Sequence, residues 1–217
     1  AVGNFEKDLV AKGLSQAQTK MKLTRTNAEN SQATSFGVNK GVVILGDSVA
    51  LRSKDQIESS IDNVAIDAVV SRNLSTINDL LKDYADSNAL AKDVVIAGGV
   101  NEIDDYKGVI NKMIKNLPKG HHIIFVTPYN GSKSGSKAVS LVQLRKYELE
   151  MAKKYDFVTV ADWYQVAKEN ISIWNGTDGV HFGSDSDSIN RGAKLYTNTI
   201  KEAIAKANQK PVKGGKK

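Results

Sequence analysis

The sequence predicts an α/β domain in which a five-stranded parallel sheet is covered by helices on both faces. Two features of the 217 residues lead to this fold class. Five short apolar runs are continuous rather than alternating, which is typical of strands buried on both faces. Helical stretches separate these runs, and such strand–helix alternation produces a parallel sheet with right-handed crossovers.

The predicted elements are short and follow one another closely along the chain. Strands are expected at residues 42–45, 64–66, 94–97, 123–126 and 157–160, which are rich in β-branched or aromatic residues. Helices are expected at residues 74–84, 106–117, 139–154, 163–169 and 190–207. Because functional residues of parallel sheets gather at the carboxyl ends of the strands, the segments after these runs are the candidate site.

Two segments of different composition flank the predicted domain, which covers residues 40–208. Residues 1–39 begin with a short amphipathic piece and continue with polar residues, which predicts a linker or an appendage packed on the domain. Residues 209–217 are basic and contain proline and glycine, which predicts a disordered tail. The chain starts at Ala1 without a signal peptide, so it is expected to be a mature product or an excised domain.

Composition excludes several classes of function. The absence of cysteine excludes disulfides and thiolate chemistry, and no run of eighteen apolar residues predicts a membrane span. The net charge of +6 favours a polyanionic partner. However, acidic residues are interleaved with the lysines and no RNA-binding motif is present, so we expect a solvated surface and no nucleic acid partner. Attraction to a bacterial wall or membrane face is the alternative.

Three short motifs should meet at one edge of the sheet. Gly46-Asp47-Ser48 follows the first strand, Gly99-Val100-Asn101-Glu102 follows the third, and Asp178-Gly179-Val180-His181 precedes the last helix. A serine hydroxyl needs a base to take its proton, and the base needs a carboxylate to fix its tautomer. The order Ser48, Asp178, His181 matches α/β-hydrolases, although their Gly-x-Ser-x-Gly elbow is missing. We therefore predict a catalytic triad of these three residues.

The three motifs resemble the first, third and last blocks of the SGNH, or GDSL, hydrolase superfamily. The resemblance implies a three-layer, flavodoxin-like fold and acyl-ester chemistry without a metal or other cofactor. It also implies an oxyanion hole made by the N–H groups of Ser48 and Ser71 and the side-chain amide of Asn101. The family normally has glycine at the position of Ser71, and serine there is strained if φ is positive. Asn101 has an alternative role, as a cap of the following helix.

Flanking segments are similar to a narrower family. These are Ile66-Asp67-Ala68-Val69-Val70-Ser71-Arg72, Val126-Thr127-Pro128-Tyr129 and Ala161-Asp162-Trp163-Tyr164. They resemble the extracellular domain of Gram-positive peptidoglycan O-acetyltransferases. The resemblance implies an O-acetyltransferase that moves acetyl to the C6 hydroxyl of muramic acid. It further implies a donor supplied by a membrane acyltransferase domain, a place at the extracellular face of the membrane or in the wall, and a monomeric soluble fragment.

Several alternatives stay open at this level. The same residues serve a carbohydrate esterase with water as acceptor, whereas a non-catalytic wall-binding module should have lost a triad residue. Trp174 lies four residues before Asp178, where it either walls a substrate groove or anchors the core. His121 and His122 open a strand at the opposite edge, so we expect surface residues there and no metal site.

Overall fold

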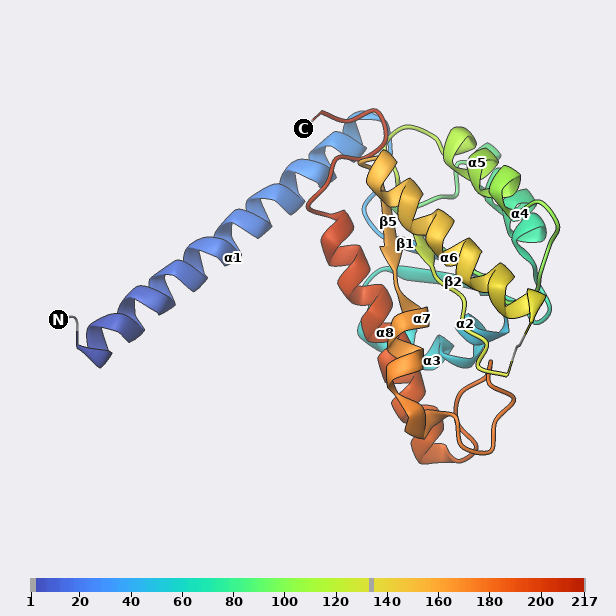
Figure 1. Cartoon of the computed structure of the whole chain (residues 1–217). Helices are drawn as coiled ribbons and strands as arrows, with labels where there is room; N and C mark the ends of the chain where they lie inside the picture. Colours follow the sequence, from blue (N-terminus) through green and yellow to red (C-terminus); the bar gives the residue numbers. More distant parts are fainter. Residues whose placement is uncertain (1–2, 133–134, 217) are drawn as a thin grey trace.

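The computed structural model describes residues 3–132 and 135–216, and it contains a central five-stranded sheet (Figure 1). All neighbouring strands pair in parallel, in the order β2-β1-β3-β4-β5. The strands are β1 (Val42–Gly46), β2 (Val64–Ala68), β3 (Asp93–Ala97), β4 (His122–Val126) and β5 (Val158–Ala161). The predicted fold class is confirmed, and the strand ends differ from the predicted ones by two residues at most.

Helices cover both faces of the sheet, as the alternating pattern predicts (Figure 1). One face carries α4 (Leu74–Asp86), α5 (Tyr106–Asn116) and α6 (Ser136–Lys154). The other carries α3 (Lys54–Ser60), α7 (Trp163–Glu169) and α8 (Ser186–Ala207). Short pieces at the carboxyl edge are α2 (Ser48–Arg52) and the 3₁₀ helix η1 (Ile171–Ile173). Within the described residues, no helix has the length and apolarity that a membrane span requires.

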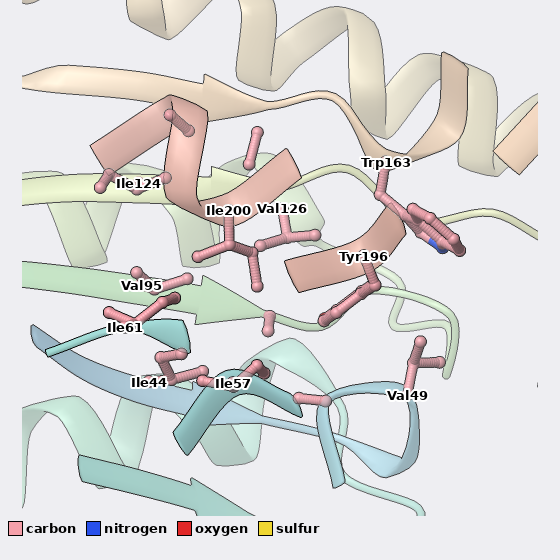
Figure 2. Packing of buried hydrophobic residues seen from close by; sticks show 14 of the residues in the cluster. Ile44, Val49, Ile57, Ile61, Val95, Ile124, Val126, Trp163, Tyr196 and Ile200 are labelled. Atoms are coloured by element: carbon pink, nitrogen blue, oxygen red, sulfur yellow. The ribbon is translucent and has the colours of Figure 1, made fainter. Parts of the chain in front are cut away.

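The strands are buried on both sides because successive side chains point to opposite faces. Along β1, Val43 and Leu45 pack against α4 and α5, whereas Ile44 points to the face covered by α8. Figure 2 shows this second face, where Ile44, Val95 and Ile124 of three neighbouring strands belong to the same cluster as Ile200 of α8. Each fully buried aliphatic side chain contributes about 1.5–3 kcal/mol relative to exposure. Each continuous apolar run of the sequence therefore supplies side chains to the apolar clusters on both faces of the sheet.

The segment before the sheet, for which the sequence predicts a linker or an appendage packed on the domain, is helical. Residues 4–35 form one long helix, α1 (Asn4–Ser35), that projects from the body (Figure 1). Its contacts with the rest of the protein lie in its C-terminal part, where Gln209 donates to the Lys22 carbonyl and where Glu29 and Ala33 are fully buried. Good helix formers such as alanine, lysine, glutamine and leucine make up much of α1, so local propensity stabilises it. The apolar periodicity is missing because most of the helix does not contact the domain.

The tail is packed rather than disordered as far as residue 216. Val212 is buried beside Ala33 and Val38, and its N–H donates to Glu29 Oε2 at 2.9 Å. The backbone of Lys213 bonds to Gly120 and His121. One buried apolar side chain and these hydrogen bonds offset the ordering entropy, which composition alone does not reveal.

The prediction that His121 and His122 lie at the surface is wrong. His122 is fully buried, with Nδ1 at 2.7 Å from Asp93 Oδ1 and Nε2 at 2.8 Å from the Lys210 carbonyl. His121 is also buried, and its Nδ1 contacts the Ala91 carbonyl. The two histidines fasten the C-terminal segment onto the amino edge of the sheet, where α1 and the tail exclude water from them.

Candidate active site

The serine of the first motif lies where β1 ends and α2 begins. Ser48 is the first residue of α2, and Asp47 Oδ1 accepts a hydrogen bond from Val49 N at 3.0 Å. Gly46 is required at this turn because a Cβ there would come within 2.6 Å of the Ala50 Cβ. The turn thus places the Ser48 hydroxyl at the carboxyl edge of the sheet. Burial raises the pKa of Asp47 to about 6, because its effect is larger than that of the backbone N–H hydrogen bonds, which lower the pKa.

The structure brings Ser48, His181 and Asp178 into one hydrogen-bonded chain. Ser48 Oγ lies 2.7 Å from His181 Nε2, and His181 Nδ1 lies 2.7 Å from Asp178 Oδ2. A carboxylate only accepts, so Nδ1 must donate to Asp178. In the neutral ring, Nε2 is then free to accept the proton of the serine. This series of hydrogen bonds has the geometry that nucleophilic attack by a serine requires.

Asp178 is held as an anion by its surroundings. Its Oδ1 accepts hydrogen bonds from Val180 N at 2.9 Å and His181 N at 2.8 Å. Partial burial raises its pKa, but the His181 ring and these N–H groups outweigh burial and lower the pKa to about 2. Asp178 is therefore charged at neutral pH.

The predicted oxyanion donors lie on loops that follow adjacent strands. Ser71 follows β2, Ser48 follows β1 and Asn101 follows β3, and these strands are neighbours in the order β2-β1-β3. Asn101 Nδ2 donates to the Arg72 carbonyl at 2.9 Å, which joins the β2 and β3 loops and leaves its second N–H for a ligand. The cap of α5 is Asp105, so the helix-cap alternative for Asn101 is wrong.

Ser71 has φ 65°, in the left-handed region that favours glycine. The adjacent Arg72 anchors this turn, because its Nη1 lies 2.8 Å from both the Asp67 carbonyl and the Asp67 carboxylate. Tyr84 donates a further hydrogen bond to Asp67 Oδ2. These contacts of Asp67 hold the residue next to Ser71 in place and so support the strained turn.

The strand order of the sheet is that of flavodoxin-like folds, in which the position of the ligand site is known. In flavodoxin-like sheets of order 2-1-3-4-5, ligands bind where the strand order reverses, between β1 and β3. The loops after β1 and β3 carry Ser48 and Asn101, so the assembled residues lie at that position. Among the residues that the structure describes, no cluster of three metal-binding side chains is found.

Comparison with solved structures finds the C-terminal catalytic domain of peptidoglycan O-acetyltransferase A (OatA) from Streptococcus pneumoniae, solved with a methylsulfonyl adduct. It is 44% identical, with a TM-score of 0.79, over 81% of this chain and 98% of that chain. The chain belongs to the OatA catalytic-domain family. The resemblance to SGNH hydrolases that the motifs predict is thereby confirmed.

Other relatives are more distant from this OatA-family domain. A putative peptidoglycan O-acetyltransferase of Bacillus subtilis, YrhL, is 28% identical over 165 residues, which is 76% of this chain. The chain spans about a quarter of the length of that relative, 24%. A GDSL-like lipase from Bacteroides thetaiotaomicron is 18% identical with a TM-score of 0.59, over 77% of this chain and 89% of that chain, which shows a shared fold. No family model matches the chain.

Trp174 lies beside the site but is anchored in the core of the OatA-family fold. Its Nε1 donates to the Ala167 carbonyl at 2.8 Å, and its ring packs 4.9 Å from Tyr129 and 6.3 Å from Trp163. The side chain remains partly exposed. The anchoring role is therefore present, and a role in binding substrate stays a prediction.

Sequence reasoning missed Arg52. Its Nε donates to the Phe182 carbonyl at 2.6 Å and its Nη2 to the Gly183 carbonyl at 2.7 Å, directly after His181. The guanidinium also lies over the Phe182 ring. Arg52 thus ties the helix that begins at Ser48 to the loop that carries His181. In the sequence, only the position of Arg52 one turn after Ser48 indicated a role at the site. Its partner Phe182 lies 130 residues away in sequence.

Proposed function

We propose that this domain is a serine-dependent O-acetyltransferase that moves acetyl groups to the C6 hydroxyl of muramic acid in peptidoglycan. The observation that carries the proposal is the Ser48–His181–Asp178 chain within a domain of the OatA family. A wall-binding module without catalysis would not need this chain of hydrogen bonds. Ser48, Asp178 and His181 are the proposed catalytic residues.

The first half of the reaction acylates the serine. Ser48 Oγ attacks the ester carbonyl while His181 Nε2 takes the serine proton, and Asp178 stabilises the imidazolium. Negative charge develops on the carbonyl oxygen, where the N–H groups of Ser48 and Ser71 and the Asn101 amide can donate. When the tetrahedral intermediate collapses, the donor alcohol leaves with the proton from His181, and acetyl-Ser48 remains.

The second half transfers the acetyl group. The sugar hydroxyl loses its proton to His181 Nε2 and attacks the acetyl carbonyl of Ser48. Collapse breaks the bond to Ser48 Oγ, which regains the proton, so the product is the sugar O-acetyl ester and the free serine. Trp174 is proposed to contact the glycan through its exposed edge. The donor is proposed to come from a membrane acyltransferase domain at the extracellular face, in line with the greater length of YrhL.

The proposed function is tested by measuring how much acetyl is transferred to a sugar and how much to water. The domain is incubated with an activated acetyl ester and muramoyl or chitin oligosaccharides, and acetylated sugar and free acetate are counted. We expect serine-dependent acetylation of the muramoyl oligosaccharides above the chitin series. Free acetate alone, with every acceptor, would assign an esterase instead.

Asn101→Ala is expected to lower kcat about 10²–10³-fold with little change in KM, because one oxyanion donor is lost. Asp105→Ala is the matched control, since it removes the cap of α5 from the same loop. That variant should lose about 1 kcal/mol of stability and keep normal turnover. A destabilised but fully active Asn101→Ala protein would refute the donor role.

Arg52→Met is expected to reduce kcat, because loss of both carbonyl contacts lets the His181 loop shift; a displacement near 1 Å costs about 10²-fold. KM should change little, and Arg52→Lys should recover part of the rate by retaining one donor. Arg191→Met, which removes an exposed arginine of α8, is the control and should stay active. Equal kcat values for Arg52→Met and the control would exclude a positioning role.

A further inference from the structure

A second cavity lies at the amino edge of the sheet, opposite Ser48. Its volume is about 840 Å³, and we call it the basal groove. Its walls are α1 and the end of α8, and its base includes the first residues of β1 and β3. Figure 1 shows α1 diverging from the end of α8 at this place, and Gln209 Nε2 joins the two by donating to the Lys22 carbonyl. The groove is within the 300–1,000 Å³ range of small-ligand sites.

Lysines dominate the charge of the basal groove. Five lysines line it, against two aspartates, Asp62 and Asp93. Asp93 Oδ2 lies 3.9 Å from Lys92 Nζ, so its charge offsets that of the buried lysine. Four of the lysines are exposed and form no ion pair with a carboxylate of the described residues, namely Lys22, Lys40, Lys201 and Lys206. Unpaired cations converging on a concavity concentrate positive potential there.

The fifth lysine makes the base of the groove rigid. Lys92 is 2% exposed, and its Nζ donates to Asn30 Oδ1 at 2.6 Å and to Asn208 Oδ1 at 2.5 Å. Asn30 belongs to α1 and Asn208 follows α8, so one buried ammonium fixes both walls.

The lining also distinguishes between anionic partners. Hydroxyl and amide groups of Thr26, Ser60, Asn63 and Gln209 alternate with aliphatic surface from Val42, Ile61 and Ile204. Among the described residues, no aromatic side chain lines the groove, so nucleic acid bases find no ring there to stack on. A flat bilayer cannot enter a concavity between two helices, whereas a thin flexible chain can. Ammonium groups bind phosphate as point charges, and the polar groups suit hydroxyls.

We propose that the basal groove binds a phosphodiester polymer with polyol or sugar units. The polymer would run between α1 and α8 with its phosphates at the exposed lysines and its hydroxyls at the amides. Such binding would hold the domain on a polyanionic matrix while the opposite edge of the sheet stays open. The proposal depends on none of the catalytic assignments.

The test measures binding of fluorescent poly(glycerol phosphate) to the full chain. Variant one carries three substitutions in the basal groove together, Lys40→Gln, Lys201→Gln and Lys206→Gln. The matched control is Lys82→Gln, Lys112→Gln, Lys146→Gln, which removes the same charge from α4, α5 and α6. Three lost ionic contacts should weaken binding about tenfold or more in variant one. The control should bind like the wild type, and added salt should weaken wild-type binding.

Each other outcome overturns the proposal. Equal weakening in both variants would mean that net charge alone attracts the polymer. No binding by the wild type, or binding only to vesicles containing anionic lipid, would exclude a polymer site. Melting temperature and hydrolysis of an activated acetyl ester should be unchanged in both variants, which separates failure of this proposal from failure of the proposed function.

Discussion

Ser48→Ala should abolish acetyl transfer and acetyl-ester hydrolysis, with kcat falling by about 10⁶-fold, as for nucleophile removal in a serine protease. The hydroxyl is the atom that must bond to the acyl carbon, and it lies 2.7 Å from the nitrogen that takes its proton. Alanine keeps the backbone N–H and fits the first turn of α2, so the fold should persist. Activity is measured with an activated acetyl ester and with the sugar acceptor.

A serine-directed sulfonyl fluoride provides a second readout of the same prediction. It should label the peptide that contains Ser48 in the wild type and leave the Ser48→Ala protein unlabelled. Ser59→Ala on α3 is the control, because its hydroxyl bonds only to the Gln56 carbonyl on the helix surface. The control should react and turn over normally. Wild-type turnover by Ser48→Ala would end the case for a serine mechanism.

Asp178→Asn should lower kcat by about 10⁴-fold, the size of the corresponding change in a serine protease. The geometry gives the reason. Because Oδ1 accepts two backbone N–H groups, the asparagine oxygen must take that place, and its NH₂ then faces His181 Nδ1. The imidazole must accept at Nδ1 and carry its proton on Nε2, where it cannot take the proton of Ser48.

The same carboxylate makes a prediction about pH. The pKa of Asp178 is lowered from 3.8 to about 2, so its stabilising interactions are complete above pH 3.8 and are lost as pH falls toward 2. Any change in rate with pH above 3.8 must therefore come from a group other than Asp178. For the Asp178→Asn variant, the control is Asp187→Asn, which removes an exposed ion pair with Arg191 and should keep the wild-type kcat. Full activity in Asp178→Asn would point to a different base.

The sequence by itself determined the sheet and the order of the site. Continuous β-branched runs have few alternatives to buried parallel strands, so β1 to β5 could be placed from residue types alone. Gly46-Asp47-Ser48 and Asp178-Gly179-Val180-His181 are local motifs whose geometry depends on neighbouring residues. Backbone turns of this kind are encoded within a few positions, which is why motif and structure agree.

Tertiary structure decided what depends on residues that are distant in the chain. Arg52 contacts carbonyls beyond His181, Val212 packs on Ala33, and His122 is buried by α1 and the tail. The hydrogen bond from Asn101 to the Arg72 carbonyl likewise depends on the loop after β2 lying beside the loop after β3. Composition describes the average surroundings of a residue, whereas burial and hydrogen bonding depend on which distant partner the fold supplies.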